Sequence, residues 1–177
     1  MDLDERQQKI RDMLTGDGIV TPSILGDALR LSAFEALKYL PPDMVSFAPG
    51  SEFESIWNEA SSWERVTFLM EHCGNVIEIE GKLPLGKTAM GYYNLRQAGS
   101  PLSGHLKPGD VKNIAMASLP FMGRESHAIH FFDAEGKVLY SVYVGRRGHE
   151  LINEVRSSFL NLQSCWRKTG KCAEVAK

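Results

Sequence analysis

The chain has 177 residues, of which 43% are hydrophobic and 24% are charged, a composition ordinary for a soluble globular protein. This length favours one domain, or one domain with a small helical appendage. The formal net charge of −2 argues against strong sequence-independent binding of nucleic acid, because such binding requires many Lys and Arg side chains. No signal-peptide pattern is present, and no apolar run approaches the ~20 residues that span a bilayer. We therefore expect no membrane insertion and a cytoplasmic protein.

Residues 1–42 are predicted to form an N-terminal helical segment. The apolar pattern predicts helices over 4–14, 22–30 and 33–40. The second and third have the length and turn of a helix-turn-helix. A recognition helix needs basic or amide side chains facing the groove, and the third helix offers only Lys38. We expect these helices to pack on the rest of the protein, with transcriptional regulation as the less favoured alternative.

Residues 43–167 are predicted to form the main domain, a β-rich unit that ends in a helix. Short connections with turn residues imply antiparallel neighbours, because parallel strands need a long crossover. Helices are predicted over 51–61 and 148–166. Strands are predicted over 45–47, 66–72, 75–80, 90–95, 111–118, 127–132 and 137–144. The expected fold class is α+β, a large antiparallel sheet meander with N-terminal helices and a C-terminal helix, followed by a polar tail over 168–177.

Residues 81–88 match the phosphate-binding P-loop pattern G-x-x-x-x-G-K-T as G-K-L-P-L-G-K-T. A P-loop holds phosphates with backbone N–H groups, and Pro84 removes one of them. The residues after Thr88 are a poor helix sequence, and the βαβ alternation of a nucleotide-binding sheet is missing downstream. We therefore predict that no nucleotide binds here.

The cysteines and histidines show no spacing typical of a metal site, neither C-x-x-C nor H-E-x-x-H. Cys73, Cys165 and Cys172 are expected to be free thiols in a reducing cytoplasm. His127 and His130 differ by three residues in a strand-like run, so their side chains should point to opposite faces. No G-x-S-x-G motif occurs. The residues by themselves leave the function open.

Eight short stretches between residues 34 and 162 occur in the order of one protein family. They are L-P-P (40–42), W-E-R-V-T (63–67), G-K-L-P (81–84), G-Y-Y-N-L-R (91–96), S-G-H-L-K (103–107), F-M-G-R-E-S (121–126), F-F-D-A-E-G (131–136) and V-G-R (144–146). Each is weak alone, and the ordered set is fairly specific. In these stretches the chain resembles the HutX/ChuX family of intracellular haem-utilisation carrier proteins, which is related to the haem-degrading HemS/ChuS-like proteins.

The resemblance implies that haem is the carried ligand and that the protein is not itself an enzyme. It also implies a homodimer and transfer of haem to a haem-degrading protein of the same pathway. Long apolar strand runs such as 138–144 agree with a dimer, because they need cover on both faces. A haem-modifying or haem-degrading enzyme is the alternative, since the resemblance extends to degrading relatives. Haem affinity, the delivery partner and a preference for another tetrapyrrole stay open.

The resemblance also implies two iron-binding positions, since two histidines are associated with haem in the family. One lies in the S-G-H stretch, a loop or strand start, and falls on His105, which we expect to be an axial ligand. The other follows W-x-x-V-T, and without gaps its position holds Glu71, with His72 one residue later. A one-residue step on a strand reverses the face of the side chain. Either a bulge brings His72 round, or the second site is not a histidine, or the sixth iron position is water or open.

A haem carrier also needs cations for the two propionates of the porphyrin, together with an apolar slot and one or two neutral imidazoles. Lys87, Arg96 and Lys107 lie near His105 in the sequence and are the candidates for binding the propionates. The alternative for each is a solvated surface charge, because Lys and Arg are mostly exposed in proteins.

Overall fold

The computed structural model describes residues 1–169, which form five α-helices, two 3₁₀ turns and eleven strands. The helices and turns are α1 (Leu3–Thr15), α2 (Pro22–Leu29), α3 (Ala33–Leu37), η1 (Gly50–Glu52), α4 (Phe53–Ser62), η2 (Pro108–Asp110) and α5 (Asn153–Thr169). The strands are β1 (Val45–Pro49), β2 (Val66–His72), β3 (Asn75–Gly81), β4 (Gly86–Ala89), β5 (Tyr92–Leu95), β6 (Gly104–Leu106), β7 (Asn113–Ala117), β8 (Ala128–Phe132), β9 (Val138–Val144), β10 (Arg146–Arg147) and β11 (Glu150–Leu151).

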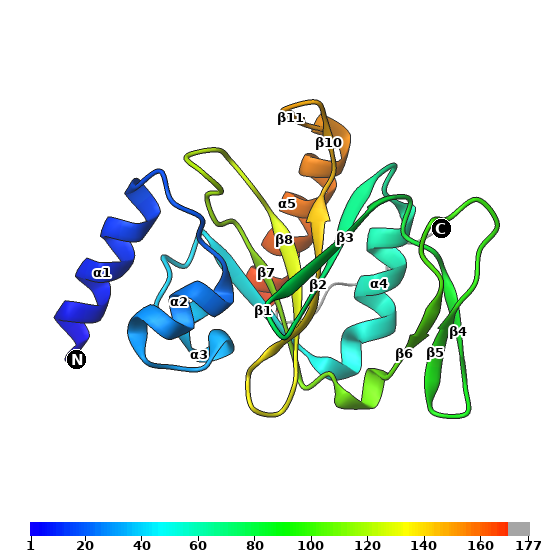
Figure 1. Ribbon diagram of the computed structural model, residues 1–177, viewed down its shortest axis with the longest axis horizontal. Coiled ribbons are helices and arrows are strands. Elements are labelled where there is room, and N and C mark those ends of the chain that lie inside the picture. Colours follow the sequence, from blue (N-terminus) through cyan, green and yellow to red (C-terminus); the bar gives the residue numbers. More distant parts are fainter. Residues whose placement is uncertain (170–177) are drawn as a thin grey trace.

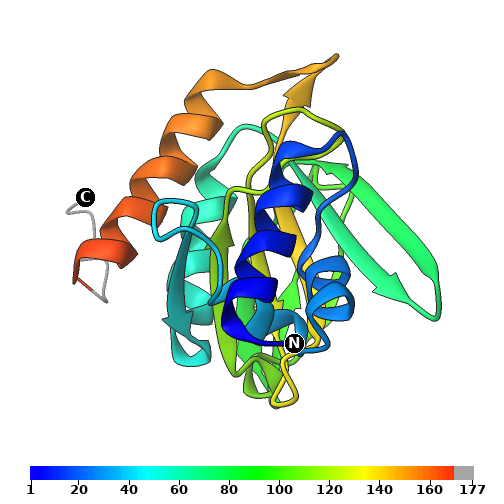
Figure 2. The same ribbon diagram turned by 90° about the vertical axis from the view of Figure 1, so that its left-hand side faces the viewer.

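Six strands form the main sheet in the order β1-β7-β8-β9-β2-β3, and all neighbours are antiparallel. A second sheet of three antiparallel strands has the order β4-β5-β6, and β10 pairs with β11. Helices α1 to α3 lie on one side of the main sheet, whereas α4, α5 and the three-stranded sheet lie on the other (Figure 1). In Figure 2 the green hairpin of β2 and β3 projects away from the body of the sheet.

The main sheet separates two hydrophobic cores, and alternation along β7 shows how. Ile114 and Met116 enter the larger core with α4 and α5, while Ala115 and Ala117 enter the smaller core with α1, α2 and α3. All four side chains are at most 1% exposed. A strand buried on both faces needs apolar residues at every position, which is why this segment lacks the apolar–polar alternation of a surface strand.

The three-stranded sheet is held against α4 by one face of β5. Tyr93 and Leu95 are 2% and 3% exposed and belong to the larger core. The ring of Tyr93 lies 5.3 Å from that of Phe53, centroid to centroid, and its hydroxyl donates to Asn58 Oδ1 at 3.1 Å. Burial raises the pKa of Tyr93. Because side chains alternate along a strand, Tyr92 and Asn94 are turned outward.

The structure confirms the α+β class and the large antiparallel sheet with helices at both ends. The third predicted helix, 33–40, ends at Leu37, and the predicted strand over 90–95 begins only at Tyr92, because positions 90 and 91 form a turn. Strands β4, β10 and β11 were not predicted, and β6 forms where the sequence left a loop or the start of a strand as alternatives. Of the predicted polar tail 168–177, residues 170–177 lie outside the described part of the chain.

His127, directly before β8, and His130, within β8, face opposite cores. His127 packs on Phe159 of α5 at 5.1 Å between ring centroids, and His130 packs on Phe132 in the opposite core, so the prediction of opposite faces is confirmed. Cys73 is a free, exposed thiol. Cys165 is disulfide-bonded, so the expectation of a free thiol is wrong there, and Cys172 lies outside the described residues.

His130 gives the fold a pH dependence. Its side chain is 2% exposed, its Nδ1 lies 2.7 Å from Ser141 Oγ, and burial lowers its pKa to about 3. The unfolded chain binds a proton below a pKa of about 6.5, whereas the folded chain does not until about pH 3. The free energy of unfolding should therefore fall as the pH drops below about 6.5, by up to about 1.4 kcal/mol per pH unit from this group.

Urea unfolding between about pH 7 and about pH 4 measures this slope. His130→Gln, which can still hydrogen-bond Ser141, should lose that part of the pH dependence even if it is less stable overall. Equal slopes in the wild type and the variant would contradict the assignment.

Candidate functional site

The outward face of the three-stranded sheet carries three of the predicted site residues. The register pairs Lys87 with Asn94 and Asn94 with His105, so these three side chains form a row on one face. Tyr92 and Lys107 lie two residues along from Asn94 and His105, which places them on the same face. The opposite face is buried against α4. One short sheet thus gathers an imidazole, a phenol ring and two ammonium groups.

His105 is the best defined side chain of this face. It lies in β6, so this segment is a strand rather than a loop, and its side chain is exposed. Its Nδ1 is 2.7 Å from Asn94 Oδ1, and its ring meets that of Tyr92 edge to face, with 6.0 Å between centroids. No group of residues 1–169 contacts its Nε2 by a hydrogen bond. The imidazole therefore has one nitrogen in a hydrogen bond and the other without one among residues 1–169.

The predicted cations near His105 carry charges that the described residues do not neutralise. Lys107 Nζ lies 5.7 Å from the ring centroid of the partly exposed Tyr92, a cation–π contact. Arg96 follows β5 directly and is exposed. Within residues 1–169, neither Lys87, Arg96 nor Lys107 forms an ion pair with a carboxylate. This face is consequently able to attract an anionic ligand.

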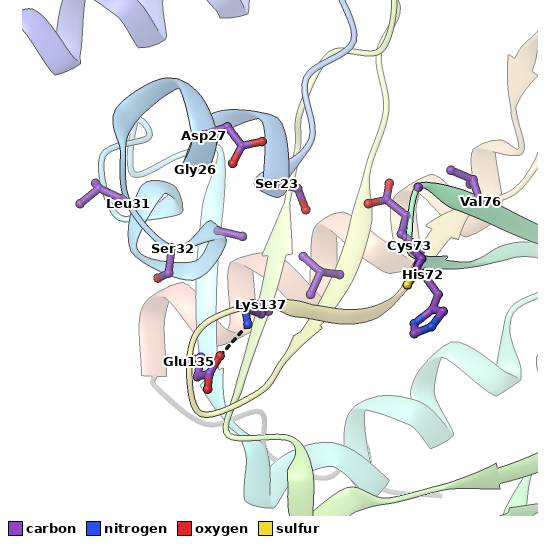
Figure 3. Close-up of a pocket in the computed structure, with 14 residues that line it drawn as sticks. Ser23, Gly26, Asp27, Leu31, Ser32, His72, Cys73, Val76, Glu135 and Lys137 are labelled. Carbon is purple, nitrogen blue, oxygen red and sulfur yellow. Dashed lines mark ion pairs between the residues drawn. The ribbon is translucent and has the colours of Figure 1, made fainter.

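Glu71 and His72 lie elsewhere, at the end of the β2–β3 hairpin. Both line an open pocket of about 600 Å³ between that hairpin and the α2–α3 segment (Figure 3). The β2–β3 register runs without interruption to the pairs Glu71–Val76 and His72–Asn75, so the bulge considered from the sequence is not present. Figure 1 places β6 beyond α4, on the far side of the main sheet from α2 and α3. The fold of one chain does not bring His72 to His105.

The pocket at His72 is acidic. Asp27, Glu71 and Glu135 line it, and the ammonium of Lys137 is paired with Glu135 at 2.7 Å (Figure 3). Burial, reinforced by the charges of Glu71 and Glu78, raises the pKa of the nearby Tyr143 to about 12. A dianionic ligand meets net repulsion here, in contrast to the face around His105.

The segment that matches the P-loop pattern has a different structure. Strand β4 follows Leu85, where a P-loop would begin a helix. The carbonyl oxygen of Pro84 accepts a hydrogen bond from Trp57 Nε1 at 2.8 Å, and a Cβ at Gly86 would lie 2.5 Å from Tyr93 Cε1. These residues fit the segment against α4, so the prediction that it is no phosphate cradle agrees with its geometry.

The α2–α3 segment is built for packing. Helix α3 has only five residues, and its apolar side chains enter the smaller core. Lys38, the one basic side chain of the segment predicted as a recognition helix, is paired with Glu35 at 2.6 Å and lies over the Phe34 ring. This arrangement leaves no basic helix face of the kind that enters a DNA groove.

Residues 1–169 contain neither a cluster of metal-binding side chains nor a membrane-spanning helix. In that part of the chain, no three His, Cys, Asp or Glu side chains are grouped so that they could hold a metal ion. None of its helices has the length and apolar character needed to cross a membrane.

Comparison with known proteins identifies the family. The model of the family described as haem utilisation ChuX/HutX matches residues 46–162. The chain belongs to this family. It is 35% identical over 162 residues to the intracellular heme transport protein HutX of Vibrio cholerae serotype O1. The matched region covers 91% of this chain and 84% of HutX.

Solved structures of the ChuX/HutX family and its relatives share the fold. The crystal structure of ChuX matches with a TM-score of 0.83 at 28% identity, over 95% of this chain and 99% of ChuX. ChuS, an E. coli heme oxygenase, matches with a TM-score of 0.66 at 15% identity, over 78% of this chain and 42% of ChuS. At that identity the likeness to ChuS is one of fold alone.

Two residues of this face had no role in the sequence analysis. Tyr92 and Asn94 stand in the stretch G-Y-Y-N-L-R, but nothing in the sequence pairs that stretch with the one around His105. The available signal was alternation: Tyr93 and Leu95 take the inward positions, so Tyr92 and Asn94, which alternate with them, face outward once the strand is assigned. Their meeting with His105 depends on the β5–β6 register, which the two short strands do not encode locally.

Proposed function

We propose that this member of the ChuX/HutX family is a cytoplasmic haem carrier that passes haem to a haem-degrading protein of the same pathway. The observation that carries the proposal is the exposed imidazole of His105 beside an aromatic ring and unpaired cations. Haem is an apolar plate with two carboxylates and an iron that accepts axial ligands. The 35% identity to a protein named for heme transport supports the same conclusion.

In this proposal, each chemical part of haem has a counterpart on the outward face of β4–β6. His105 would hold the iron through Nε2, and the ring of Tyr92 would offer the porphyrin an apolar surface. Lys87, Arg96 and Lys107 are the candidates for the propionates, to which their charges are attracted over several ångströms. The face is open to solvent, which suits a carrier, because a fully enclosing pocket would oppose release. Glu71 and His72 stay a second, separate candidate position.

Replacing His105 by Ala tests the ligand. Loss of the imidazole should shift the Soret maximum of the hemin complex and weaken hemin binding by about tenfold or more, since loss of even a hydrogen-bond partner of a metal ligand typically costs 10–100-fold. The fold should persist, because the side chain is exposed. An absorbance titration with hemin measures both quantities, and far-UV circular dichroism checks the fold.

His72→Ala is the matched control, as a second exposed histidine at a strand position. It should change the spectrum and the affinity less than His105→Ala does, because its surroundings are acidic. The reverse order of effects would move the proposed iron ligand to His72.

We also propose that the protein is a homodimer built on its main sheet. Strand β3 is an edge strand of the main sheet, and its Val76 and Ile77 are 55% and 56% exposed. An exposed edge with apolar side chains is the kind of surface that proteins cover by association.

Light scattering at micromolar concentration should therefore give the mass of a dimer. Ile77→Lys should shift the equilibrium toward monomer, because a charge at an apolar contact is desolvated without a partner. Lys82→Ala, on the loop after β3, serves as a control that should leave the mass unchanged. A strictly monomeric wild type would contradict the proposal.

The carrier proposal differs from haem degradation in what happens to the porphyrin. When the hemin complex is incubated with ascorbate, oxygen and catalase, a carrier should keep its Soret band. A sample without ascorbate serves as the reference. Steady loss of the Soret band with the appearance of a ring-opened product would instead favour the enzymatic alternative.

A further inference from the structure

The side chain of Asn94 lies between the β4–β5 hairpin and His105. Its Nδ2 donates toward three backbone carbonyl oxygens, at 3.0 Å from Lys87, 3.3 Å from Ala89 and 3.1 Å from Tyr92. Its Oδ1 is 2.7 Å from Nδ1 of His105. One amide therefore joins the hairpin backbone to the imidazole on the neighbouring strand.

The orientation of this amide follows from the chemistry of its neighbours. Carbonyl oxygens only accept hydrogen bonds, so the group facing the three carbonyls must be the NH₂. Turning the amide over would set Oδ1 of Asn94 against three oxygens and leave all three hydrogen bonds unmade. The oxygen of the side chain is thus fixed on the side of His105.

The fixed amide oxygen decides which nitrogen of His105 carries the proton. Because Oδ1 of Asn94 can only accept, the imidazole nitrogen 2.7 Å away must donate, and the proton sits on Nδ1. In a neutral imidazole the other nitrogen, Nε2, then has the lone pair. Nε2 is also the nitrogen that makes no hydrogen bond within residues 1–169.

We propose that Asn94 is a positioning residue that holds His105 in the Nδ1–H tautomer, with the lone pair of Nε2 presented to an incoming iron. This inference rests on the proposed role of His105 as a haem ligand and adds how the ligand is prepared. Histidines that bind metals usually donate their other N–H to an oxygen acceptor, which fixes the ring and raises its basicity. Here that acceptor is in place before the ligand arrives, so no reorientation of the ring is needed on binding.

The hairpin gives Asn94 a second role that the experiment must separate. The β4–β5 turn contains Met90 at φ 54° and Gly91 at φ 79°, the backbone of a tight two-residue hairpin turn. The amide NH₂ supports this turn, whereas the amide oxygen acts on His105. Asn94→Asp keeps an oxygen acceptor for His105 and loses the NH₂, while Asn94→Leu loses both at similar volume. A merely structural role would make the two variants behave alike.

The direct test reads the tautomer of His105 in the protein without haem. Two-dimensional ¹⁵N–¹H spectra of the imidazole rings, recorded where they are neutral, distinguish Nδ1–H from Nε2–H. We expect His105 to be Nδ1–H in the wild type and in Asn94→Asp, and to revert in Asn94→Leu toward Nε2–H, the form that predominates in free histidine. His72, whose imidazole has no hydrogen-bond partner in the described chain, is the internal reference for the free form.

Hemin titration supplies the second reading. Asn94→Leu should bind hemin about 10–100-fold more weakly, the usual cost of losing such a partner. Asn94→Asp keeps the acceptor for His105 but sets an oxygen against the three carbonyls, so it should lose clearly less affinity than Asn94→Leu. A wild-type His105 in the Nε2–H form overturns the inference. So does an Asn94→Leu variant that keeps the Nδ1–H tautomer, or one that binds hemin as tightly as the wild type. Equal loss of binding in both variants also overturns it, because that result assigns Asn94 to the hairpin alone.

The two proposals fail in different ways. If His105→Ala binds hemin with wild-type affinity and spectrum, the proposed ligand is wrong and this inference falls with it. If His105→Ala loses binding while the tautomer or the Asn94→Leu result is contrary, the haem site stands and the role of Asn94 alone is wrong.

Discussion

The burial of one side of β5 against α4 decides which side chains the three-stranded sheet presents to solvent. Tyr93 is 2% exposed, and its hydroxyl accepts from the backbone N–H of Gly86 at 3.0 Å and donates to Asn58. Any side chain at Gly86 would collide with the Tyr93 ring. These contacts fix β4 and β5 together against the helix, and alternation then leaves Tyr92 and Asn94 facing outward.

In the proposed function, an outward face fixed in this way would let a small protein bind a large planar ligand without a deep cavity. The other side of the sheet belongs to the larger core, and Lys87, Tyr92 and His105 stand on strands, with Arg96 and Lys107 directly after them. The unpaired cations near His105 and the carboxylates near His72 give these two places on the molecule opposite electrostatic character. This difference would favour a dianionic ligand at the former over the latter.

The sequence predicts the long elements and misses the short ones, for a physical reason. Helices and strands with a buried face carry an apolar period, as α5 and β7 to β9 do. Strand β4 has four residues and β6 has three, too few to show a period, and both exist through pairing with β5. The predicted role of His105 rested on resemblance, whereas its partner Asn94 is visible only in the register. From the sequence alone, a bulge at Glu71 and His72 was one of the alternatives. The continuous pairing of β2 with β3 in the structure excludes that bulge.

The most direct test of the account is to locate the porphyrin. Gallium protoporphyrin IX is a diamagnetic analogue of haem, so its binding can be followed by the backbone amide shifts of the protein. The account predicts that the largest changes fall in residues 86–107, which contain β4, β5 and β6. Changes centred instead on residues 71–76 and on the α2–α3 segment would place the ligand in the acidic pocket and contradict it.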